Sequence, residues 1–307
     1  MAGRANIPVP GVLYVLQDTD GLGDGFLMDW LSGETLGQRI VKSEALAGIR
    51  PSLARQCGEV LARLHAIELD QELAKSLPTI GPASLVQETW DHYRELDVPV
   101  AMIDYSARWL LENLPSQPRQ TLVHGDFRNG NLMIDETGIV AVLDWELAQL
   151  GDPVRDLGWL CVNSWRFGCS DLPVGGFGAI EDLLEGYQAE SGIVISNEDL
   201  RFWQIFGSFW WSVTTLGMAA TWRSGETPSL ERPVIGRRSS EAQMDCVNLV
   251  IPGDFALPQA IELDEGTQLP MPAELLEGVR SFLREEVAAG DQQRFGFLAK
   301  VAANSLG

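Results

Sequence analysis

The chain has 307 residues, of which 45% are hydrophobic and 21% charged, and its formal net charge is −21. An acidic protein of this kind is a poor candidate for binding nucleic acid or an anionic membrane surface, because both need a basic surface on the protein. No run of about 18 apolar residues occurs, and the four Cys and three His lack zinc-binding spacing, so we expect a protein of the reducing cytoplasm without a transmembrane span.

Two short apolar segments, 12–16 and 26–31, are predicted to form strands near the N-terminus, with an Asp- and Gly-rich segment between them. The spacing Gly21-x-Gly23-x-Gly25 is compatible with a phosphate-binding loop, but no helical pattern follows it, as a dinucleotide-binding fingerprint requires. Because Asp and Gly dominate turns that need φ > 0, we prefer to interpret this segment as a hairpin turn.

The remainder of the chain is predicted to be mostly helical. A helix that opens at Pro51 carries apolar residues at helical spacing on one face: Leu53, Cys57, Val60, Leu61 and Leu64. It ends at His65, which we interpret as a packed structural residue. Six of the ten Trp fall in the later helical region, where they should fill the core first, with some of them lining a substrate pocket. Further helices are expected over 84–96, 101–113, 153–165, 177–191, 197–222 and 233–250, and a hairpin is expected over about 121–143.

The predicted central hairpin carries an unusual set of polar residues. Residues 121–134 read TLVHGDFRNGNLMI, and a second apolar run, 139–143, ends in Asp144. A carboxylate and an amide oxygen from one tight loop, Asp126 and Asn131, together with the carboxylate of Asp144, form a hard oxygen set of the kind that Mg²⁺ prefers. A carboxylate that stays free of metal can accept a proton from a hydroxyl group. This combination suits phosphoryl transfer, where positioning and charge neutralisation supply most of the catalysis.

Three motifs occur in a recognisable order: HGDFRNGN at 124–131, VLDWE at 142–146 and GDPVRDL at 151–157. They resemble the catalytic loop, the second metal motif and the following segment of the aminoglycoside phosphotransferase family, which is related to the protein kinases. The resemblance implies an α+β, protein-kinase-like fold with a truncated N-terminal lobe and a mostly helical C-terminal lobe. It also implies transfer of the γ-phosphate of ATP or GTP to a small-molecule hydroxyl group, with Mg²⁺ as cofactor.

The same resemblance implies a role for each motif residue. Asp126 would be the catalytic base that orients or deprotonates the acceptor hydroxyl. Asn131 and Asp144 would hold Mg²⁺ on the nucleotide phosphates. Arg128 would stand over the transferred phosphate, although a solvated surface charge is the alternative for this residue. Two further residues would brace the catalytic loop, His124 from within it and Asp156 from the next helix.

Residues 26–33 resemble the strand and hinge that join the two lobes of a kinase. The resemblance implies that backbone groups near Asp29, Trp30 and Leu31 meet the edge of the adenine base. Met28 would line the pocket around that base. These four residues are therefore the expected nucleotide-binding residues of the chain.

The strand Lys that grips the nucleotide phosphates in this family has no counterpart, because Arg4 is the only basic residue before the hinge. Three explanations stay open: the chain is a fragment, it is a non-catalytic nucleotide- or ligand-binding module, or another chain supplies the missing lobe. We favour a fragment, because the acid set is intact. Two strands alone form a marginal sheet in water, so their apolar faces should stay uncovered.

Segments 224–226 and 235–238 resemble the subgroup of kinase-like domains that are fused to acyl-CoA dehydrogenases. This implies a hydroxylated small-molecule acceptor, with a hydroxyacyl thioester as one candidate, and an acyl-CoA dehydrogenase-type functional partner. No nucleic-acid or membrane partner is expected. The expected division of the chain is a remnant of the N-terminal lobe with the hinge at 1–31, a helical catalytic lobe at 32–252, a linker at 253–270 and the start of a small helical appendage at 271–307.

Overall fold

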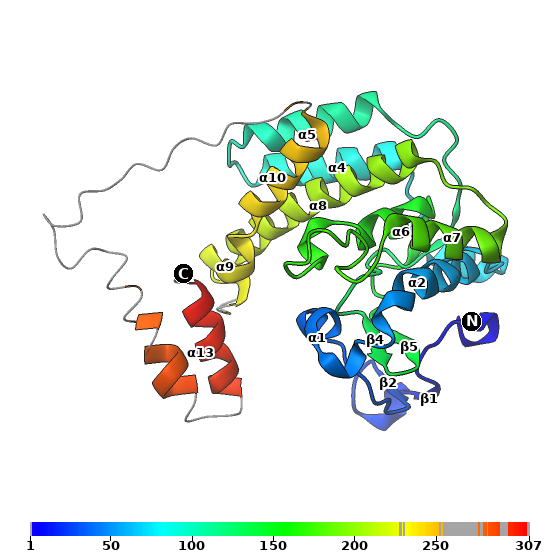
Figure 1. The fold of residues 1–307 in the computed structure, drawn as a ribbon, viewed down its shortest axis with the longest axis horizontal. Helices are drawn as coiled ribbons and strands as arrows, with labels where there is room; N and C mark the ends of the chain where they lie inside the picture. Colours follow the sequence, from blue (N-terminus) through cyan, green and yellow to red (C-terminus); the bar gives the residue numbers. More distant parts are fainter. Residues whose placement is uncertain are drawn as a thin grey trace, which may run out of the picture.

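The computed structural model describes residues 2–226, 229, 231–251, 253, 276, 279–280, 282–288 and 294–305 (Figure 1). The linker expected over 253–270 therefore lies outside the described residues except for Gly253. Of the expected appendage, 271–307, the described part contains the π-helix η5 (Phe282–Val287) and helix α13 (Arg294–Ser305). None of the helices in the described residues combines the length and the apolarity that a membrane span requires.

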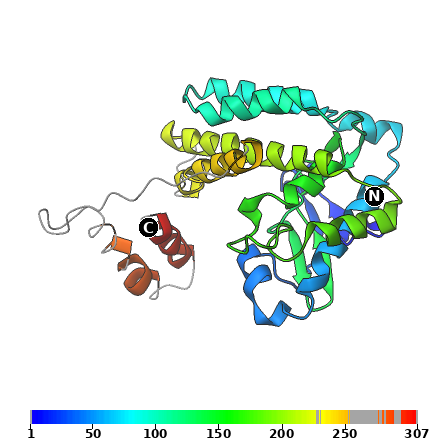
Figure 2. The same ribbon diagram turned by 45° about the horizontal axis from the view of Figure 1, so that its top comes forward.

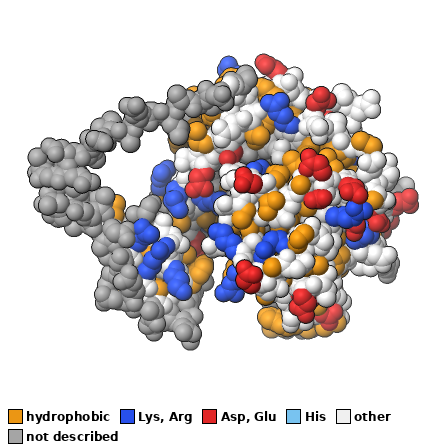
Figure 3. Space-filling model, in the orientation of Figure 1, with side chains coloured by type: hydrophobic (Ala, Val, Ile, Leu, Met, Phe, Trp, Pro, Cys, Tyr) orange, Lys and Arg blue, Asp and Glu red, His pale blue; other side chains and the backbone are white. Residues whose placement is uncertain are grey.

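The N-terminal segments form the hairpin that the sequence predicts. Strands β1 (Val12–Val15) and β2 (Phe26–Met28) pair antiparallel, and the Asp- and Gly-rich segment between them forms a turn with the short 3-10 helix η2 (Asp18–Asp20). Every residue of both strands is exposed, as expected for a two-stranded sheet without a covering layer. Their hydrophobic side chains gather at the lower edge of the molecule in Figure 3.

Most of the chain is helical, and the longest helix, α8 (Asn197–Arg223), runs through the middle of the helical region. The helices α4 (Pro82–Glu95), α5 (Ala101–Glu112), α6 (Val154–Leu160), α9 (Glu231–Gly236) and α10 (Ser239–Val250) pack against α8. In Figures 1 and 2, α8 and the helices packed on it lie to one side of the molecule. The hairpin β1–β2 and the hairpin formed by β4 (Leu132–Asp135) and β5 (Gly138–Val142) lie to the other. The remaining helices of this part of the chain are η1 (Ala2–Ala5), α1 (Gly37–Lys42), η3 (Glu44–Leu46), α2 (Arg50–His65), α3 (Gln71–Ser76), η4 (Asn163–Trp165) and α7 (Ile180–Ser191).

Two of the predicted helices are divided in the structure. The helix expected over 153–165 ends at Leu160 and is followed by the 3-10 helix η4, and the helix expected over 233–250 consists of α9 and α10. The division between α9 and α10 follows Gly236, where α9 approaches α8 so closely that an added Cβ would lie 2.6 Å from Cβ of Ala219. The single-helix prediction was wrong there: Gly disfavours a helix, and the contact with α8 that Gly236 permits is a tertiary feature that helical periodicity does not reveal.

The strands around the central motif pair differently from the single hairpin expected over 121–143. Strand β3 (Thr121–Val123) pairs with β6 (Gln149–Gly151), and β4 (Leu132–Asp135) pairs with β5 (Gly138–Val142), in both cases antiparallel. Strand β6 was missed because three residues, Gln149, Leu150 and Gly151, carry too little pattern to predict a strand. Since the β4–β5 pair is nested inside the β3–β6 pair, the loop between β3 and β4 and the loop between β5 and β6 emerge at the same end.

Helix α2 connects this strand assembly to the helical core. Its buried face contains the five apolar residues that the sequence predicts, and it packs against α7. The side-chain oxygen of Gln56 on α2 accepts a hydrogen bond of 3.1 Å from the backbone N–H of Ile139 on β5. The two nested strand pairs are therefore attached to the main core, and so are the loops that leave them.

Candidate active site

The carboxylate of Asp126 is fixed by three side-chain N–H donors. Its Oδ1 atom accepts a hydrogen bond of 2.9 Å from Nε of Arg128 and one of 2.7 Å from the indole Nε1 of Trp159. Its Oδ2 atom accepts a hydrogen bond of 2.6 Å from Nδ2 of Asn131. Asp126 is only 9% exposed. Most of the side chain is therefore buried, and a small part of it is accessible at the surface of the loop. The arrangement gives this acid one defined orientation.

Asp156 holds the backbone of the catalytic loop from α6. Its Oδ2 atom accepts a hydrogen bond of 2.7 Å from the backbone N–H of His124, and its Oδ1 atom accepts one of 2.9 Å from the backbone N–H of Gly125. The ring of His65 at the end of α2 lies 3.2 Å from Oδ2 of the same carboxylate. The structure thus places Asp156 where the resemblance expects a brace, and it adds His65 to that brace.

The charge of Asp156 depends on these contacts. Burial by itself would raise the pKa of this fully buried carboxyl group. The hydrogen bond and the electrostatic attraction of the His65 ring, together with the electrostatic attraction of the His124 ring and the backbone hydrogen bond of His124, outweigh burial and hold the pKa of Asp156 below its ordinary value. The carboxylate is therefore the form in which Asp156 accepts hydrogen bonds from the loop.

His124 links the two loops that emerge from the nested strands. Its Nδ1 atom accepts a hydrogen bond of 3.2 Å from the backbone N–H of Asp126, and its Nε2 atom lies 3.0 Å from the carbonyl oxygen of Leu143. Burial lowers the pKa of His124, although Asp156 and other nearby acceptors act in the opposite direction. A neutral ring with its proton on Nε2 satisfies both contacts. The adjacent Gly125 has φ +83, and an added Cβ there would collide with the carbonyl oxygen of Leu147, so the loops approach each other closely at this point.

Asn131 and Asp144 stand at the open end of the β4–β5 hairpin, where the expected metal ligands can meet. Leu132 pairs with Val142, and the backbone N–H of Leu143 donates a hydrogen bond of 2.8 Å to the carbonyl oxygen of Asn131. The side-chain nitrogen of Asn131 is engaged by Asp126, which leaves its amide oxygen for another partner. Asp144 is exposed, and its carboxylate accepts no hydrogen bond from the described residues.

This donor set fits Mg²⁺ in its chemistry, because both available groups are hard oxygen ligands and Mg²⁺ retains several positions for water and phosphates. The described residues contain no group of three or more His, Cys, Asp or Glu side chains that could hold a metal ion by themselves. A cation here would therefore depend on the amide oxygen of Asn131, the carboxylate of Asp144 and oxygens of a bound ligand.

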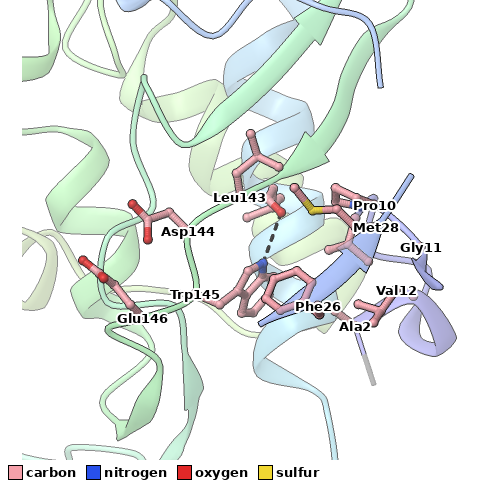
Figure 4. Close-up of a pocket in the computed structure, with 13 residues that line it drawn as sticks. Ala2, Pro10, Gly11, Val12, Phe26, Met28, Leu143, Asp144, Trp145 and Glu146 are labelled. Carbon is pink, nitrogen blue, oxygen red and sulfur yellow. Dashed lines mark hydrogen bonds between the residues drawn. The ribbon is translucent and has the colours of Figure 1, made fainter. Parts of the chain in front are cut away.

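A cavity of about 870 Å³ lies between the N-terminal hairpin and the end of β5 (Figure 4). Its apolar part includes Phe26, Met28 and Trp145, whereas the carboxylates of Asp144 and Glu146 lie on the opposite side. The lining residues are Ala2, Gly3, Val9, Pro10, Gly11, Val12, Phe26, Met28, Val142, Leu143, Asp144, Trp145 and Glu146. The cavity wall thus contains both the predicted nucleotide-binding residue Met28 and, on the opposite side, the predicted metal ligand Asp144.

The three other predicted nucleotide-binding residues do not line this cavity. The backbone N–H of Asp29 donates a hydrogen bond of 2.9 Å to the carbonyl oxygen of Gly11, which extends the β1–β2 pairing. Trp30 is 95% exposed, and Leu31 follows it outside the cavity wall. The structure therefore supports Met28 as a wall residue and gives Asp29, Trp30 and Leu31 no contact with the cavity.

Arg128 is not the solvated surface charge that was its alternative interpretation. Besides its bond to Asp126, its Nη1 atom donates a hydrogen bond of 2.9 Å to the carbonyl oxygen of Asn129, and its guanidinium carbon lies 4.4 Å from the ring centroid of Trp165. The sequence did not single out Asn129, Trp159 or Trp165 for this site. The only signal for them in the sequence is that they lie within or shortly after the motifs. Their hydrogen bonds join residues that are 36 and 33 positions apart, Asn129 to Trp165 and Trp159 to Asp126.

Comparison with known proteins adds independent findings. A family model described as "Phosphotransferase enzyme family" matches residues 2–192. Mouse acyl-CoA dehydrogenase family member 10 is 35% identical over 172 residues, which are 52% of this chain and 15% of that protein. Chicken acyl-CoA dehydrogenase family member 11 is 28% identical over 273 residues, which are 81% of this chain and 32% of that protein. The chain thus spans less than a third of the length of either relative.

Three solved structures with similar folds are distant in sequence from this chain. A protein from Ralstonia eutropha described as an aminoglycoside phosphotransferase has a TM-score of 0.68 and 21% identity, with 80% of this chain and 79% of that chain covered. A choline/ethanolamine kinase family protein from Mesorhizobium loti has a TM-score of 0.56 and 17% identity, with 82% and 76% covered. The GDP complex of aminoglycoside 2'-phosphotransferase-IIIa has a TM-score of 0.54 and 14% identity, with 79% and 76% covered. These likenesses confirm the expected α+β, protein-kinase-like fold.

Proposed function

We propose that the chain, which belongs to the phosphotransferase enzyme family, transfers the γ-phosphate of ATP or GTP to a hydroxyl group of a small molecule in a Mg²⁺-dependent reaction. The observation that carries this proposal is the carboxylate of Asp126, which three N–H donors orient beside the open end of β4–β5. A carboxylate held in one orientation and near the surface is suited to accept a proton from a bound hydroxyl group.

The proposed reaction needs one proton acceptor and one correctly placed nucleophile. Asp126 accepts the proton of the acceptor hydroxyl as the hydroxyl oxygen forms a bond to the γ-phosphorus. The bond between that phosphorus and the β–γ bridging oxygen breaks, and the nucleoside diphosphate leaves. Arg128 lies beside Asp126 with its guanidinium group stacked on Trp165, where its positive charge can stabilise negative charge on the transferred phosphate.

Asn131 and Asp144 would hold the Mg²⁺ ion through the amide oxygen and the carboxylate. When bound, the ion would neutralise charge on the nucleotide phosphates. The structural support for these two residues is their shared position at the open end of the β4–β5 hairpin. Asn131 has a second task, because its side-chain nitrogen fixes Asp126.

The cavity of about 870 Å³ is the proposed nucleotide site. Its volume is within the range of roughly 300–1,000 Å³ that is common for small-molecule sites. The apolar surface around Phe26, Met28 and Trp145 suits a purine base, and the opposite side, with Asp144, suits the metal-bound phosphates. This arrangement does not distinguish ATP from GTP.

The proposed acceptor site lies along α8. The ring of Trp210 packs on Trp159, with 5.1 Å between ring centroids, and Trp159 bonds to Asp126. Thr214 lies about one helical turn beyond Trp210. It is one of the residues that line a cavity of about 420 Å³, whose walls are partly polar and partly apolar. We propose a hydroxyacyl thioester as one acceptor and an acyl-CoA dehydrogenase as functional partner, because the names of the relatives associate this kind of chain with such enzymes.

A second function, that of a non-catalytic nucleotide-binding module, is favoured by one observation. Among the described residues that line the nucleotide cavity, none is Lys or Arg, so the wall of this cavity supplies no side-chain cation to the nucleotide phosphates. For either function, the four cysteines, Cys57, Cys161, Cys169 and Cys246, are free thiols, which supports the proposed cytoplasmic location.

The test is a phosphate-transfer assay with radiolabelled ATP and GTP and a panel of hydroxylated acceptors that includes hydroxyacyl thioesters and aminoglycosides. The substitution Asp126→Asn should reduce turnover by about 10²-fold or more while nucleotide affinity stays the same. Equal turnover in Asp126→Asn would remove this residue as the base. Nucleotide binding without any phosphate transfer, in both the natural chain and the variant, would favour the binding-module alternative.

A further inference from the structure

Two neighbouring residues of the catalytic loop hold the same tryptophan in different ways. Asn129 is fully buried, and its Nδ2 atom donates a hydrogen bond of 3.1 Å to the carbonyl oxygen of Trp165. The guanidinium carbon of Arg128 lies 4.4 Å from the ring centroid of Trp165. The backbone and the ring of one residue are thereby tied to consecutive positions of the loop, although 36 residues separate Trp165 from Asn129.

Asn129 also fixes a second point in the segment that connects η4 to α7. Its Nδ2 atom donates a hydrogen bond of 2.5 Å to the carbonyl oxygen of Gly175. The backbone N–H of Gly175 in turn donates a hydrogen bond of 3.1 Å to the carbonyl oxygen of Leu160, the last residue of α6. One buried amide therefore joins the catalytic loop to both ends of the segment 165–175 and, through that segment, to α6.

These contacts restrict the position of Arg128. An exposed arginine samples many rotamers, and a single ion pair at the surface restrains it only weakly. Arg128 is restrained on three sides, because Nε donates to Asp126, Nη1 donates to the carbonyl oxygen of Asn129, and the guanidinium face lies on Trp165. Stacking on an aromatic face contributes attraction that a solvated arginine lacks.

We propose that Asn129 and Trp165 are positioning residues that form a clamp on Arg128 and, through Arg128, on Asp126. The inference rests on the proposed function, since the arrangement matters for catalysis only if Asp126 accepts the proton. Neither clamp residue needs to touch the substrate. The clamp instead fixes the charge that faces the transferred phosphate and the carboxylate that faces the acceptor hydroxyl, and such pre-positioning is a large part of catalysis in phosphoryl transfer.

The kinetic test compares two substitutions at one position. Trp165→Phe keeps an aromatic face under Arg128 and should leave kcat within about threefold of the natural chain, whereas Trp165→Leu removes the face and should lower kcat about tenfold. Nucleotide KM should change little in either variant, because Trp165 is not in the nucleotide cavity. Asn129→Asp, which places a carboxylate against two carbonyl oxygens, should also lower kcat about tenfold or more.

The control is Asn163→Ala on η4. Asn163 donates a hydrogen bond of 3.0 Å to Asp245 on α10 and makes no hydrogen bond to the catalytic loop within the described residues, so kcat should be unchanged. Equal losses in Trp165→Phe and Trp165→Leu, or no loss in either, would overturn the clamp. The clamp would also be overturned if a lower fraction of folded protein accounted for the whole loss of kcat in Trp165→Leu.

A spectroscopic measurement keeps the clamp testable if the chain transfers no phosphate. The Nε–Hε signal of Arg128 can be identified in ¹⁵N NMR spectra by its disappearance in Arg128→Lys. The ring of Trp165 should shift this signal in the natural chain and in Trp165→Phe, and the shift should be lost in Trp165→Leu and reduced in Asn129→Asp. If the signal does not move in the last two variants, the clamp is wrong whether or not the chain is active. If it moves while no phosphate is transferred, the positioning stands and the proposed function fails.

Discussion

The indole Nε1 of Trp159 donates a hydrogen bond of 2.7 Å to Oδ1 of Asp126, which joins the end of α6 to the proposed catalytic base. Trp159 is 3% exposed, and its ring packs against Trp165, Trp210 and Trp211. The hydrogen bond therefore extends from a rigid aromatic cluster to a loop. It replaces one water molecule in the solvation of the carboxylate by a donor that cannot move away.

Removal of this donor should reduce turnover more than it reduces nucleotide affinity. In Trp159→Phe the carboxylate of Asp126 keeps Arg128 and Asn131 as donors but loses one charge-assisted hydrogen bond, so kcat should fall about tenfold. Trp203→Phe is the matched control, because Trp203 is also buried but its indole N–H makes no hydrogen bond in the described residues. Steady-state kinetics of both variants measure this effect. Equal kcat values in Trp159→Phe and Trp203→Phe would show that aromatic packing, and not the hydrogen bond to Asp126, is responsible for the loss.

Asp144 should determine the need for Mg²⁺. Removal of a residue that hydrogen-bonds to a metal ligand lowers metal affinity by roughly 10–100-fold. Asp144→Asn removes a proposed ligand itself, so the Mg²⁺ concentration for half-maximal activity should rise at least about tenfold. Glu146→Gln is the control, because Glu146 also lines the cavity and the substitution removes the same negative charge. Titration of activity with Mg²⁺ after treatment with a chelator measures the effect. A similar shift in both variants would indicate a general charge effect in place of ligation.

The two sides of the predicted hinge should differ in their effect on nucleotide binding. Met28→Ala removes apolar contact area from the cavity wall and should weaken nucleotide affinity about fivefold to tenfold. Trp30→Ala should leave affinity unchanged, because Trp30 is 95% exposed and lies outside the wall. Binding of a fluorescent nucleotide analogue to both variants provides the comparison. Weaker binding in Trp30→Ala would indicate that the Trp30 side chain, and not only the backbone near it, takes part in the nucleotide site.

Asp156 should make stability depend on pH in the acid range. The pKa of Asp156 in the folded chain lies below its ordinary value, so the unfolded chain binds a proton more readily than the folded chain. The stability that this carboxylate contributes is therefore fully present above about pH 4, the ordinary value for Asp, and it is lost as the pH falls toward the lower value of the folded state.

The substitution Asp156→Asn isolates this contribution. It removes the charge beside His65 and one of the acceptors for the backbone N–H groups of His124 and Gly125, so the free energy of unfolding at pH 7 should fall by about 3 kcal/mol. The difference between the natural chain and Asp156→Asn should shrink below about pH 4. Urea unfolding at several pH values measures it, and a difference that stays constant between pH 7 and pH 3 would contradict this account.

The local pattern of the sequence was sufficient to predict a mostly helical chain, the N-terminal hairpin and most of the helices, whereas the kinase-like fold was implied by the resemblance of the three motifs. Apolar residues at helical spacing on 50–65 predict the buried face of α2, and the alternation of Asp and Gly at 18–25 predicts the turn between β1 and β2. Each of these elements is determined by residues that are close in the sequence. The order of the three motifs likewise predicted Asp126, Asn131 and Asp144 as one set, and the structure brings these residues to one end of the nested strands.

Only the tertiary structure decided how that set is held. The pairing of β3 with β6, the hydrogen bond from Trp159 to Asp126 and the two hydrogen bonds of Asn129 all join residues that are 26 or more positions apart. The sequence alone could not show that Asp29 and Trp30 lie outside the lining of the large cavity, because their position depends on how β2 pairs with β1. Local patterns predict the elements and name the chemically active residues, whereas the packing of distant elements decides which side chains touch them.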